Sequence, residues 1–368
     1  MPIEVGKGAI RLTMGPSQLG GPHAPPDNLE DEVMDFILGA RESLDVAVQE
    51  LESERVTIAL CEAAITGIDV RVILERRYLE GSRRAFKDDD HFVDDRRPHS
   101  PNRQMLRALL ASGVHVTVDL NPATFHQKYI VRDRHGTSSR AGVLTGSANF
   151  TPTGLSSNLN HLVRFRGKTV AAPFADEFKE MWSGTFGKHR TRVPKTPTSA
   201  LVGGVRVKVL FAPDHAPEME IMKQVLKATK SVEFAIFTFS QSSGIDDALS
   251  AVARGGVAVR GVFDGRQAAQ PWAATHMLTG IEGVDLFNST SDHGVDLLHH
   301  KLMVLDREIV IAGSFNYTEP ATRLNDENIV VIGERSATGE AKKAQQALAA
   351  YAAAEIERIV QFNARPFG

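Results

Sequence analysis

The chain has 368 residues, of which 42% are hydrophobic and 24% are charged. This length corresponds to about two domains, and the composition is that of an ordinary globular protein with enough apolar residues for a sizeable core. The formal net charge of −3 excludes a general attraction to nucleic acid or acidic membranes, so any such attraction has to be local. The single cysteine, Cys61, excludes an intramolecular disulfide and fits a reducing compartment.

The beginning of the sequence bears on where the protein works. The first residues, Met-Pro-Ile-Glu-Val-Gly-Lys, lack the basic start and the apolar run of a signal peptide. No stretch approaches the roughly 18 consecutive apolar residues that a membrane span requires. We therefore expect a cytoplasmic protein without a transmembrane segment.

The N-terminal part of the chain alternates predicted strands and helices. Asn28 is placed to cap a helix, and acidic residues follow it where the helix dipole favours them. This alternation predicts an α/β sheet with helices on its faces. The predicted strands are residues 9–14, 44–48 and 70–74, and the predicted helices are residues 28–40 and 53–65.

Residues 75–103 interrupt the alternation. They mix arginines, lysines and aspartates with scattered aromatic residues, and two interpretations stay open. One is a solvated, disordered loop, and the other is a lid that guides substrate near an active site. A predicted helix at residues 103–111 and a predicted strand at residues 115–120 follow.

The first motif comes next: Phe-His-Gln-Lys-Tyr-Ile-Val-Arg-Asp, and then Gly-Ser-Ala-Asn-Phe-Thr. Apolar runs beside both segments predict two short buried strands joined by a turn. Because side chains alternate along a strand, His126 and Lys128 should share one face, as should Ser147 and Asn149. Such a set suits a phosphate ester. Lysine supplies charge, hydroxyl and amide donate to its oxygens, and histidine attacks or transfers protons.

Beyond the motif, residues 163–165 predict a strand and residues 169–182 predict a helix. Residues 187–204 then predict a linker, since Pro194 and Pro197 and a Thr/Ser run break any regular pattern. The linker is basic. Two interpretations stay open: the basic linker keeps the segment soluble and long enough to join the two halves, or its charges bind phosphate.

The remainder of the chain repeats the first part. A second motif, Leu-His-His-Lys-Leu-Met-Val-Leu-Asp with Gly-Ser-Phe-Asn-Tyr-Thr, places His299, Lys301, Ser314 and Asn316 at the same local offsets. In the second half, fewer residues separate the earlier strands and helices from the motif histidine than in the first half. The charged loop is therefore an insertion peculiar to the first half. The repeated elements are predicted at residues 205–211, 217–228, 231–236 and 245–253, and an Ala-rich helix at residues 338–361 closes the chain.

Two His-x-Lys-x4-Asp motifs, each with its Gly-Ser-x-Asn, resemble the signature of the phospholipase D superfamily. The resemblance includes a downstream asparagine in each copy, Asn158 and Asn325. It implies an α/β fold: two similar α/β/α halves, with mixed sheets flanked by helices, packed as a pseudo-twofold dimer within one chain. We assign residues 1–186 to the N-terminal half, 187–204 to a linker and 205–368 to the C-terminal half. Because one chain carries both motifs, a monomer would hold a complete site.

The resemblance also implies a metal-independent phosphodiesterase whose two histidines face each other across the scissile phosphate. One histidine forms a phosphohistidine, while the other protonates the leaving oxygen and then activates water. In the family the first-motif histidine is more often the nucleophile, so we assign attack to His126 and acid/base work to His299, an order that the sequence leaves open. Lys128 and Lys301 complete the catalytic set, and the expected phosphate-binding residues are Ser147, Asn149, Ser314 and Asn316.

The two copies differ at one informative position. The family's carboxylate survives only as Glu327, and its counterpart in the first half is Asn160. A carboxylate bonded to an imidazole fixes its tautomer and stabilises the imidazolium. We expect Glu327 to orient one catalytic histidine and Asn160 to do a weaker version of the same task; which histidine each serves stays open. Asp133 and Asp306 end their strands, and we expect supporting turn or salt-bridge roles for them.

Three histidines near the second motif could suggest a metal site. His300 follows His299 and must face the other way on a strand, so we place it outside the active site. His293, His299 and His300 lack a recognised ligand spacing, and we expect neither a metal nor a cofactor.

The motif chemistry serves nucleic acids and phospholipids alike, so it does not choose a substrate. Basic clusters at residues 76–87 and 188–195, with no secretion signal and no apolar membrane-docking stretch, favour nucleic acid, either DNA or RNA. Hydrolysis of phospholipid head groups is the alternative. A non-catalytic nucleic-acid-binding protein of the same fold is the second alternative.

Overall fold

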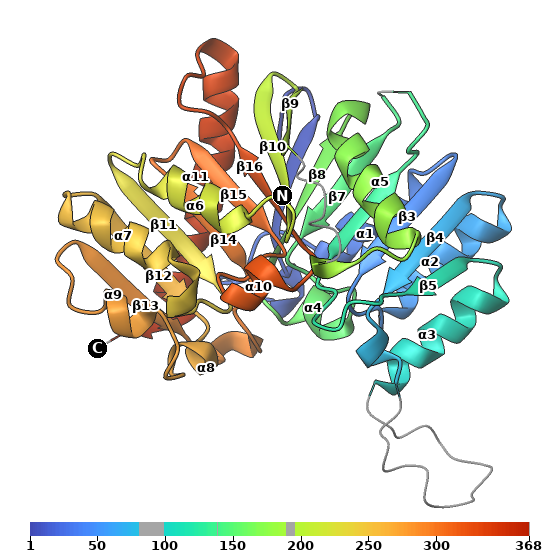
Figure 1. Ribbon diagram of the computed structural model, residues 1–368, viewed down its shortest axis with the longest axis horizontal. Helices are drawn as coiled ribbons and strands as arrows, with labels where there is room; N and C mark the ends of the chain where they lie inside the picture. Colours follow the sequence, from blue (N-terminus) through green and yellow to red (C-terminus); the bar gives the residue numbers. More distant parts are fainter. Residues whose placement is uncertain (81–98, 138, 189–195, 368) are drawn as a thin grey trace, which may run out of the picture.

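The protein consists of two α/β halves that lie side by side (Figure 1). The structure is a computed structural model that describes residues 1–80, 99–137, 139–188 and 196–367. Each half contains one mixed sheet with helices on its faces, as the sequence predicted.

The first half contains an eight-stranded sheet. Its strands are β1 (Ile3–Val5), β2 (Ile10–Gly15), β3 (Ser43–Val48), β4 (Asp69–Leu74), β5 (His115–Val118), β6 (Lys128–Arg132), β7 (Gly142–Gly146) and β8 (Asn160–Arg166), and its helices are α1 (Leu29–Leu38), α2 (Glu54–Ile65), α3 (Ser100–Ala111), α4 (Pro152–Ser156) and α5 (Lys168–Trp182). The strand order is β1-β2-β8-β7-β6-β3-β4-β5. The strands β3, β4 and β5 are parallel, and all other neighbours are antiparallel.

The second half contains a nine-stranded sheet. Its strands are β9 (Thr198–Val202), β10 (Val205–Ala212), β11 (Ser231–Ile236), β12 (Ala258–Phe263), β13 (Val284–Ser289), β14 (Lys301–Leu305), β15 (Ile309–Gly313), β16 (Glu327–Ile332) and β17 (Ala364–Pro366), and its helices are α6 (Pro217–Val225), α7 (Ile245–Arg254), α8 (Gly265–Ala268), α9 (Thr275–Leu278), α10 (Glu319–Arg323) and α11 (Gly339–Phe362). The strand order is β17-β13-β12-β11-β14-β15-β16-β10-β9.

The two sheets repeat one topology. The order β2-β8-β7-β6-β3-β4-β5 in the first corresponds to β10-β16-β15-β14-β11-β12-β13 in the second. Contacts across the interface are reciprocal, since Phe125 bridges Asp326 and Leu298 bridges Leu159. The predicted arrangement of two similar halves related by a pseudo-twofold axis is therefore confirmed.

Three hydrophobic cores hold the layers together. On β6, Tyr129 and Val131 face a central core, whereas Ile130 faces an outer core beneath α1, α2 and α3. The central core combines residues of both sheets with Phe174 of α5 and Ile356 of α11. Because the halves share this core, separating them would expose a large apolar surface, and the shared core keeps the two motifs in fixed register.

Helix starts follow the predicted capping signals. The Asn28 side chain accepts a hydrogen bond from the Asp31 backbone N–H at 3.1 Å, as expected for the residue that caps α1. Ser53, predicted as the first residue of the next helix, instead caps α2, accepting from the Val56 N–H at 3.2 Å.

The predicted linker at residues 187–204 contains regular structure at its end. Strand β9 pairs antiparallel with β10, and Ala200 lies opposite Val207. The strand was missed because its polar residues hide an alternation in which Ala200 and Val202 are buried while Leu201 is 59% exposed. Residues 189–195, which carry most of the predicted basic cluster, lie outside the described residues.

The charged loop predicted at residues 75–103 is described only at its two ends. Residues 81–98 lie outside the described residues, so the structure does not test whether this segment is a solvated loop or a lid. Arg76–Tyr78 form a short 3-10 helix, and α3 begins at Ser100 rather than at Arg103.

The Ala-rich helix predicted at residues 338–361 is α11. It packs against strands of its own half and also contacts β1 and β2 of the first half. Among the described residues, no helix is both long and apolar enough to cross a membrane.

Asp133 and Asp306 brace the ends of the motif strands. Asp133 Oδ1 accepts hydrogen bonds at 2.7–3.1 Å from the backbone N–H groups of residues 41–43. Asp306 Oδ1 accepts from residues 229–231 at 2.7–3.2 Å. Both aspartates adopt positive φ angles, 50° and 54°, which aspartate tolerates better than most residues. These contacts lie at the ends of β6 and β14 that are remote from the motif histidines.

The bracing role predicts a loss of stability rather than of chemistry. Asp306→Ala should lower the free energy of unfolding by about 2–4 kcal/mol, because three backbone donors lose a charged acceptor. Urea denaturation measures this change, and Asp306→Asn, which keeps one acceptor oxygen, should lose less. An Asp306→Ala protein of normal stability that had lost catalytic activity would contradict the bracing role.

Candidate active site

The motif lysines mark the place where the two halves meet. β6 begins at Lys128 and β14 at Lys301, so His126 and His299 precede the strands instead of lying on them as predicted. The last residue of β3 pairs with Lys128, and the last residue of β11 pairs with Lys301. The motif residues therefore lie at the carboxyl ends of β3 and β11, where chain segments from both halves converge.

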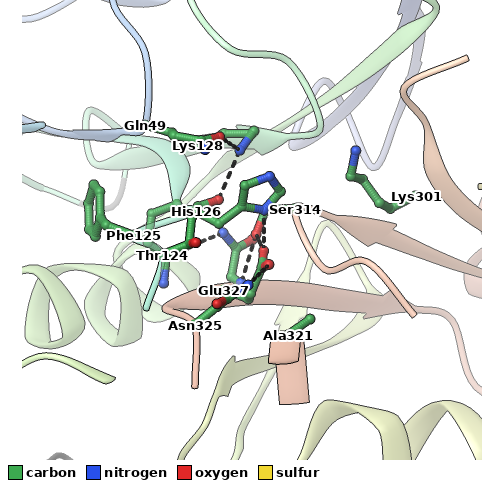
Figure 2. Close-up of polar contacts among 12 residues, drawn as sticks. Gln49, Thr124, Phe125, His126, Lys128, Lys301, Ser314, Ala321, Asn325 and Glu327 are labelled. Atoms are coloured by element: carbon green, nitrogen blue, oxygen red, sulfur yellow. Dashed lines mark hydrogen bonds and ion pairs between the residues drawn. The ribbon is translucent and has the colours of Figure 1, made fainter. Parts of the chain in front are cut away.

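Each motif histidine is held by a side chain of the opposite half. His126 Nδ1 lies 2.7 Å from Glu327 Oε2, and Figure 2 shows this pair. His299 Nδ1 lies 3.0 Å from Asn160 Oδ1. The sequence left open which histidine each partner serves, and the structure pairs Glu327 with His126 and Asn160 with His299.

The hydrogen-bond pattern defines which ring nitrogen is available for chemistry. Asn160 Nδ2 donates to the Gly154 carbonyl at 2.9 Å, so its Oδ1 is the atom that faces His299. Because Oδ1 can only accept, His299 Nδ1 must carry a proton. The Nε2 atom of each histidine is then the one that can meet a substrate, and both rings line the same cavity.

The motif serines support the partners of the histidines. Ser147 Oγ donates to Asn160 Oδ1 at 2.7 Å, and Ser314 Oγ donates to Glu327 Oε2 at 2.6 Å. Each hydroxyl has one proton, which these contacts use. Phosphate binding, which the sequence predicted for both serines, would require breaking a bond to the side chain that holds a motif histidine.

The motif asparagines differ from each other. Asn149 lines the cavity, and its Nδ2 donates to Glu50 Oε1 at 2.6 Å. Asn316 is half-buried and is not among the described residues that line the cavity.

Two buried lysines give the site a positive potential. Lys128 and Lys301 are 1% and 2% exposed, and within the described part of the chain neither forms an ion pair. Lys128 Nζ donates to Gln49 Oε1 at 3.1 Å. Lys301 Nζ donates to the His299 carbonyl at 2.9 Å and lies 4.9 Å from the centre of the Phe237 ring. In Figure 2 the two lysines lie on either side of the His126 ring.

Burial drives these groups toward their neutral forms. It lowers the pKa of Lys128 to about 8, and burial and the charge of Lys128 hold the pKa of Lys301 well below its ordinary value. Burial and the two lysine charges also lower the pKa values of His126 and His299. The pKa of Glu327 is raised by burial to about 8, against the opposing effect of Lys128. A bound anion would add negative charge beside the lysines and favour their charged forms.

The cavity between the halves has a volume of ≈ 320 Å³. Its lining includes four side chains that the motifs did not indicate: Gln49, Glu50, Tyr78 and Phe237. The first two directly follow β3 and Phe237 directly follows β11. Their place beside the motif lysines could have been inferred, because residues after a buried strand collect at the edge where binding sites form.

Carboxylates that could hold a metal ion lie elsewhere. Within the described ranges, the group with suitable spacing is Glu177, Glu180 and Asp214, and each of these residues has a further polar partner. The group includes neither motif histidine.

The fold and the site define a class of protein in which two α/β/α halves share one site built from a His-x-Lys motif of each half. The sequence model of the family described as "Cardiolipin synthase, PLD-like domain" matches residues 33–182 and 221–349, one segment in each half. These segments cover more than half of the chain. The protein therefore belongs to the phospholipase D superfamily.

Similar proteins cover only part of this chain. "Phospholipase D" of Rickettsia felis is 30% identical over 139 residues, which are 35% of this chain and 62% of the relative. "Mitochondrial cardiolipin hydrolase" of Xenopus laevis is 34% identical over 114 residues, 31% of this chain and 52% of the relative. The chain thus spans less than two thirds of the length of either relative.

A solved structure matches the whole chain. The phosphatidylserine synthase of Haemophilus influenzae Rd KW20 covers 100% of this chain and 89% of its own length, with a TM-score of 0.62 and 13% sequence identity. At this identity the likeness shows the fold alone.

The lowered lysine pKa values predict proton uptake on anion binding. Sulfate bound at pH 8 should raise the pKa of Lys128 above about 8, so Lys128 should take up as much as roughly half a proton per sulfate. Isothermal titration calorimetry in buffers of different ionisation enthalpy measures this number. Lys128→Met should lose sulfate binding, whereas the exposed Lys227→Met should not. Binding accompanied by proton release, or by no proton change, would contradict the proposed charge state.

Proposed function

We propose that the protein hydrolyses phosphodiester bonds through a covalent phosphohistidine on His126, without a metal ion. The observation that carries the proposal is the composite site: two histidines of opposite halves line one cavity with Nδ1 fixed, beside two buried lysines that form no ion pair with the described residues. A phosphodiester is an anion that needs a nucleophile on one side and a proton donor on the other.

The first step forms the covalent intermediate. The negative charge of the bound phosphodiester favours a second proton on His299, at Nε2. Nε2 of His126 attacks phosphorus, and the bond between phosphorus and the leaving oxygen breaks as this proton moves to that oxygen and leaves His299 neutral. In the second step the neutral His299 takes a proton from water, whose oxygen attacks phosphorus and releases His126. Lys128 and Lys301 stabilise the charge on the non-bridging oxygens in both steps, the task that a metal ion performs in other enzymes.

The unequal partners support the order of the two histidines. Phosphorylation on Nε2 leaves the His126 ring with a proton on Nδ1 and a positive charge. That charge lowers the pKa of Glu327, 2.7 Å away, and the resulting carboxylate stabilises the charged ring. The neutral Asn160 amide gives His299 the same orientation with less stabilisation of its imidazolium, which suits a group that must both give and take a proton.

The proposed substrate is a nucleic-acid strand. The cavity is lined largely by polar side chains, among them Gln49, Asn149 and Asn158, and Arg76 and Arg77 precede the cavity residue Tyr78. Polar lining and nearby arginines suit a sugar–phosphate chain. Phospholipid head-group hydrolysis is the second candidate, because the similar proteins named above include a phospholipase D and a cardiolipin hydrolase.

A substrate panel in the presence of EDTA tests the function and its metal independence. Purified protein should cleave single-stranded DNA, duplex DNA or RNA at unchanged rate when EDTA is added, and His126→Ala should abolish cleavage. Vesicles of phosphatidylcholine or cardiolipin form the second arm. If the protein hydrolysed only the phospholipids of the vesicles, the substrate would be a lipid rather than nucleic acid. Cleavage that is lost in EDTA and restored by magnesium would refute metal independence. Binding of nucleic acid or vesicles without cleavage of any substrate in the panel would refute the proposal that the protein is an enzyme.

A nitrophenyl phosphodiester separates the two histidines, because its leaving group needs little protonation. His299→Ala should still form the adduct on His126 and release it slowly, since the base that activates water is missing. His126→Ala should form none. Acid-quenched mass spectrometry locates the adduct. An adduct on His299 in the wild type, or one that persists in His126→Ala, would reverse the assignment.

A further inference from the structure

Behind the active site, two further pairs of side chains join the halves. Gln127 follows His126 in the first motif, and its Oε1 accepts a hydrogen bond from Asn328 Nδ2 of the other half at 2.7 Å. Thr145 Oγ1 donates to Asn328 Oδ1, also at 2.7 Å. Both amide side chains are fully buried. We call Gln127 and Asn328 the amide pair.

The pseudo-twofold axis relates the amide pair to two histidines. His300 follows His299 in the second motif, and its Nδ1 lies 3.1 Å from Nδ1 of His161, which follows Asn160. The two ring planes are within 2° of parallel, and both side chains are fully buried. We call His161 and His300 the imidazole pair. As expected from the sequence, His300 is not among the described residues that line the active-site cavity.

The contacts of the imidazole pair fix its protons. The Gly313 N–H donates to His161 Nε2 at 3.1 Å, so the His161 proton is on Nδ1. That proton is donated to His300 Nδ1, and His300 must then carry its own proton on Nε2. This Nε2 lies 3.6 Å from Glu355 Oε1 on α11, whose carboxylate accepts two hydrogen bonds from Arg358 at 2.8 Å. At this distance His300 Nε2 makes no hydrogen bond to Glu355, whereas the bond between the rings and the bond from Gly313 both require neutral rings.

Short connections link each pair to the catalytic residues. The backbone N–H of His161 donates to Ser147 Oγ at 3.0 Å, and Ser147 donates to Asn160, the partner of His299. On the other side, the Asn328 N–H donates to Ser314 Oγ at 3.0 Å, and Ser314 donates to Glu327. Each pair therefore ties a residue next to a catalytic histidine to a residue next to that histidine's partner.

We propose that the amide pair and the imidazole pair are positioning devices, each holding one catalytic histidine against its partner, and that only the imidazole pair is released by acid. Extended backbone couples neighbouring residues, so a shift of His300 moves His299, and small misplacements of a catalytic group are costly. A second proton on His300 sets two donors against each other between the Nδ1 atoms, and a second proton on His161 sets its Nε2 against the Gly313 N–H, each at 3.1 Å. The amide side chains of Gln127 and Asn328 do not take up a proton in mildly acidic solution, so acid leaves the amide pair intact. The catalytic consequence rests on the proposed function.

The charges around the imidazole pair act in both directions. Glu355 favours a second proton on His300, whereas Arg358 and Lys301 oppose it. His161 faces Ser147 and Gly313 and is disfavoured as a cation by burial, by His300 and by Lys301. Burial lowers the pKa of both rings, so the folded protein binds fewer protons than the unfolded chain, whose histidines titrate near about 6.5. The pair's contribution is complete above that pH and is lost as pH falls below it.

The test replaces the imidazole pair by a copy of the amide pair. His161→Asn with His300→Gln should keep kcat for a nitrophenyl phosphodiester at pH 8 within about threefold of wild type, because the same geometry exists in the other half. The ratio of kcat at pH 5.5 to kcat at pH 8 should rise by about fivefold or more, and the fall in Tm between these pH values should shrink by about 3 °C or more. The matched control, His276→Gln with His293→Asn, removes two exposed histidines and should change neither.

Nitrogen-15 NMR of histidine-labelled wild-type protein provides a second readout that needs no variant. At pH 7 it should place one proton on Nδ1 of His161 and one on Nε2 of His300. A reversed tautomer, an imidazolium at pH 7, or a double variant with wild-type pH dependence would overturn the proposal. If the wild type hydrolyses no phosphodiester, the proposed function fails, while melting and NMR still decide whether the pair is released by acid.

Discussion

Each motif histidine takes its orientation from the opposite half, and the rest of the site depends on these two hydrogen bonds. Glu327 reaches His126 and Asn160 reaches His299 across the pseudo-twofold interface. Neither half alone could fix a tautomer or leave a defined Nε2 atom for chemistry. The shared central core, with α5 and α11, holds the two halves in this arrangement. The motif serines and the two buried pairs behind the site hold the partners of the histidines in place.

The same interface carries an electrostatic cost. Lys128 and Lys301 are buried without a carboxylate ion pair among the described residues, and burial lowers the pKa values of both. An empty site therefore holds charge in an environment that disfavours it, and a phosphate would relieve that cost. In the proposed mechanism, the lysines that attract the substrate also stabilise charge on its oxygens. Asymmetry enters through the partners, a carboxylate on one side and an amide on the other.

The repeated motifs made much of this predictable. Their local offsets indicated the two halves, the pairing of strands and the convergence of His126, Lys128, His299 and Lys301. Other features depend on contacts that no local pattern encodes. Ser147 and Ser314 were expected at the phosphate, but their hydroxyls turn toward Asn160 and Glu327. Strand β9 was hidden by polar residues in a segment predicted as a linker. The His161–His300 contact joins residues far apart in sequence, so only the packing of the halves brings them together.

A crystal structure of the protein with vanadate tests the composite site most directly, because vanadate adopts the trigonal-bipyramidal geometry of phosphoryl transfer. The account predicts one vanadate in the cavity, bonded axially to Nε2 of His126, with Nε2 of His299 facing the opposite axial oxygen. Lys128 and Lys301 should contact the equatorial oxygens, and His126→Ala should lose the bound ion. Vanadate held by residues of only one half, or bound outside this cavity, would contradict it.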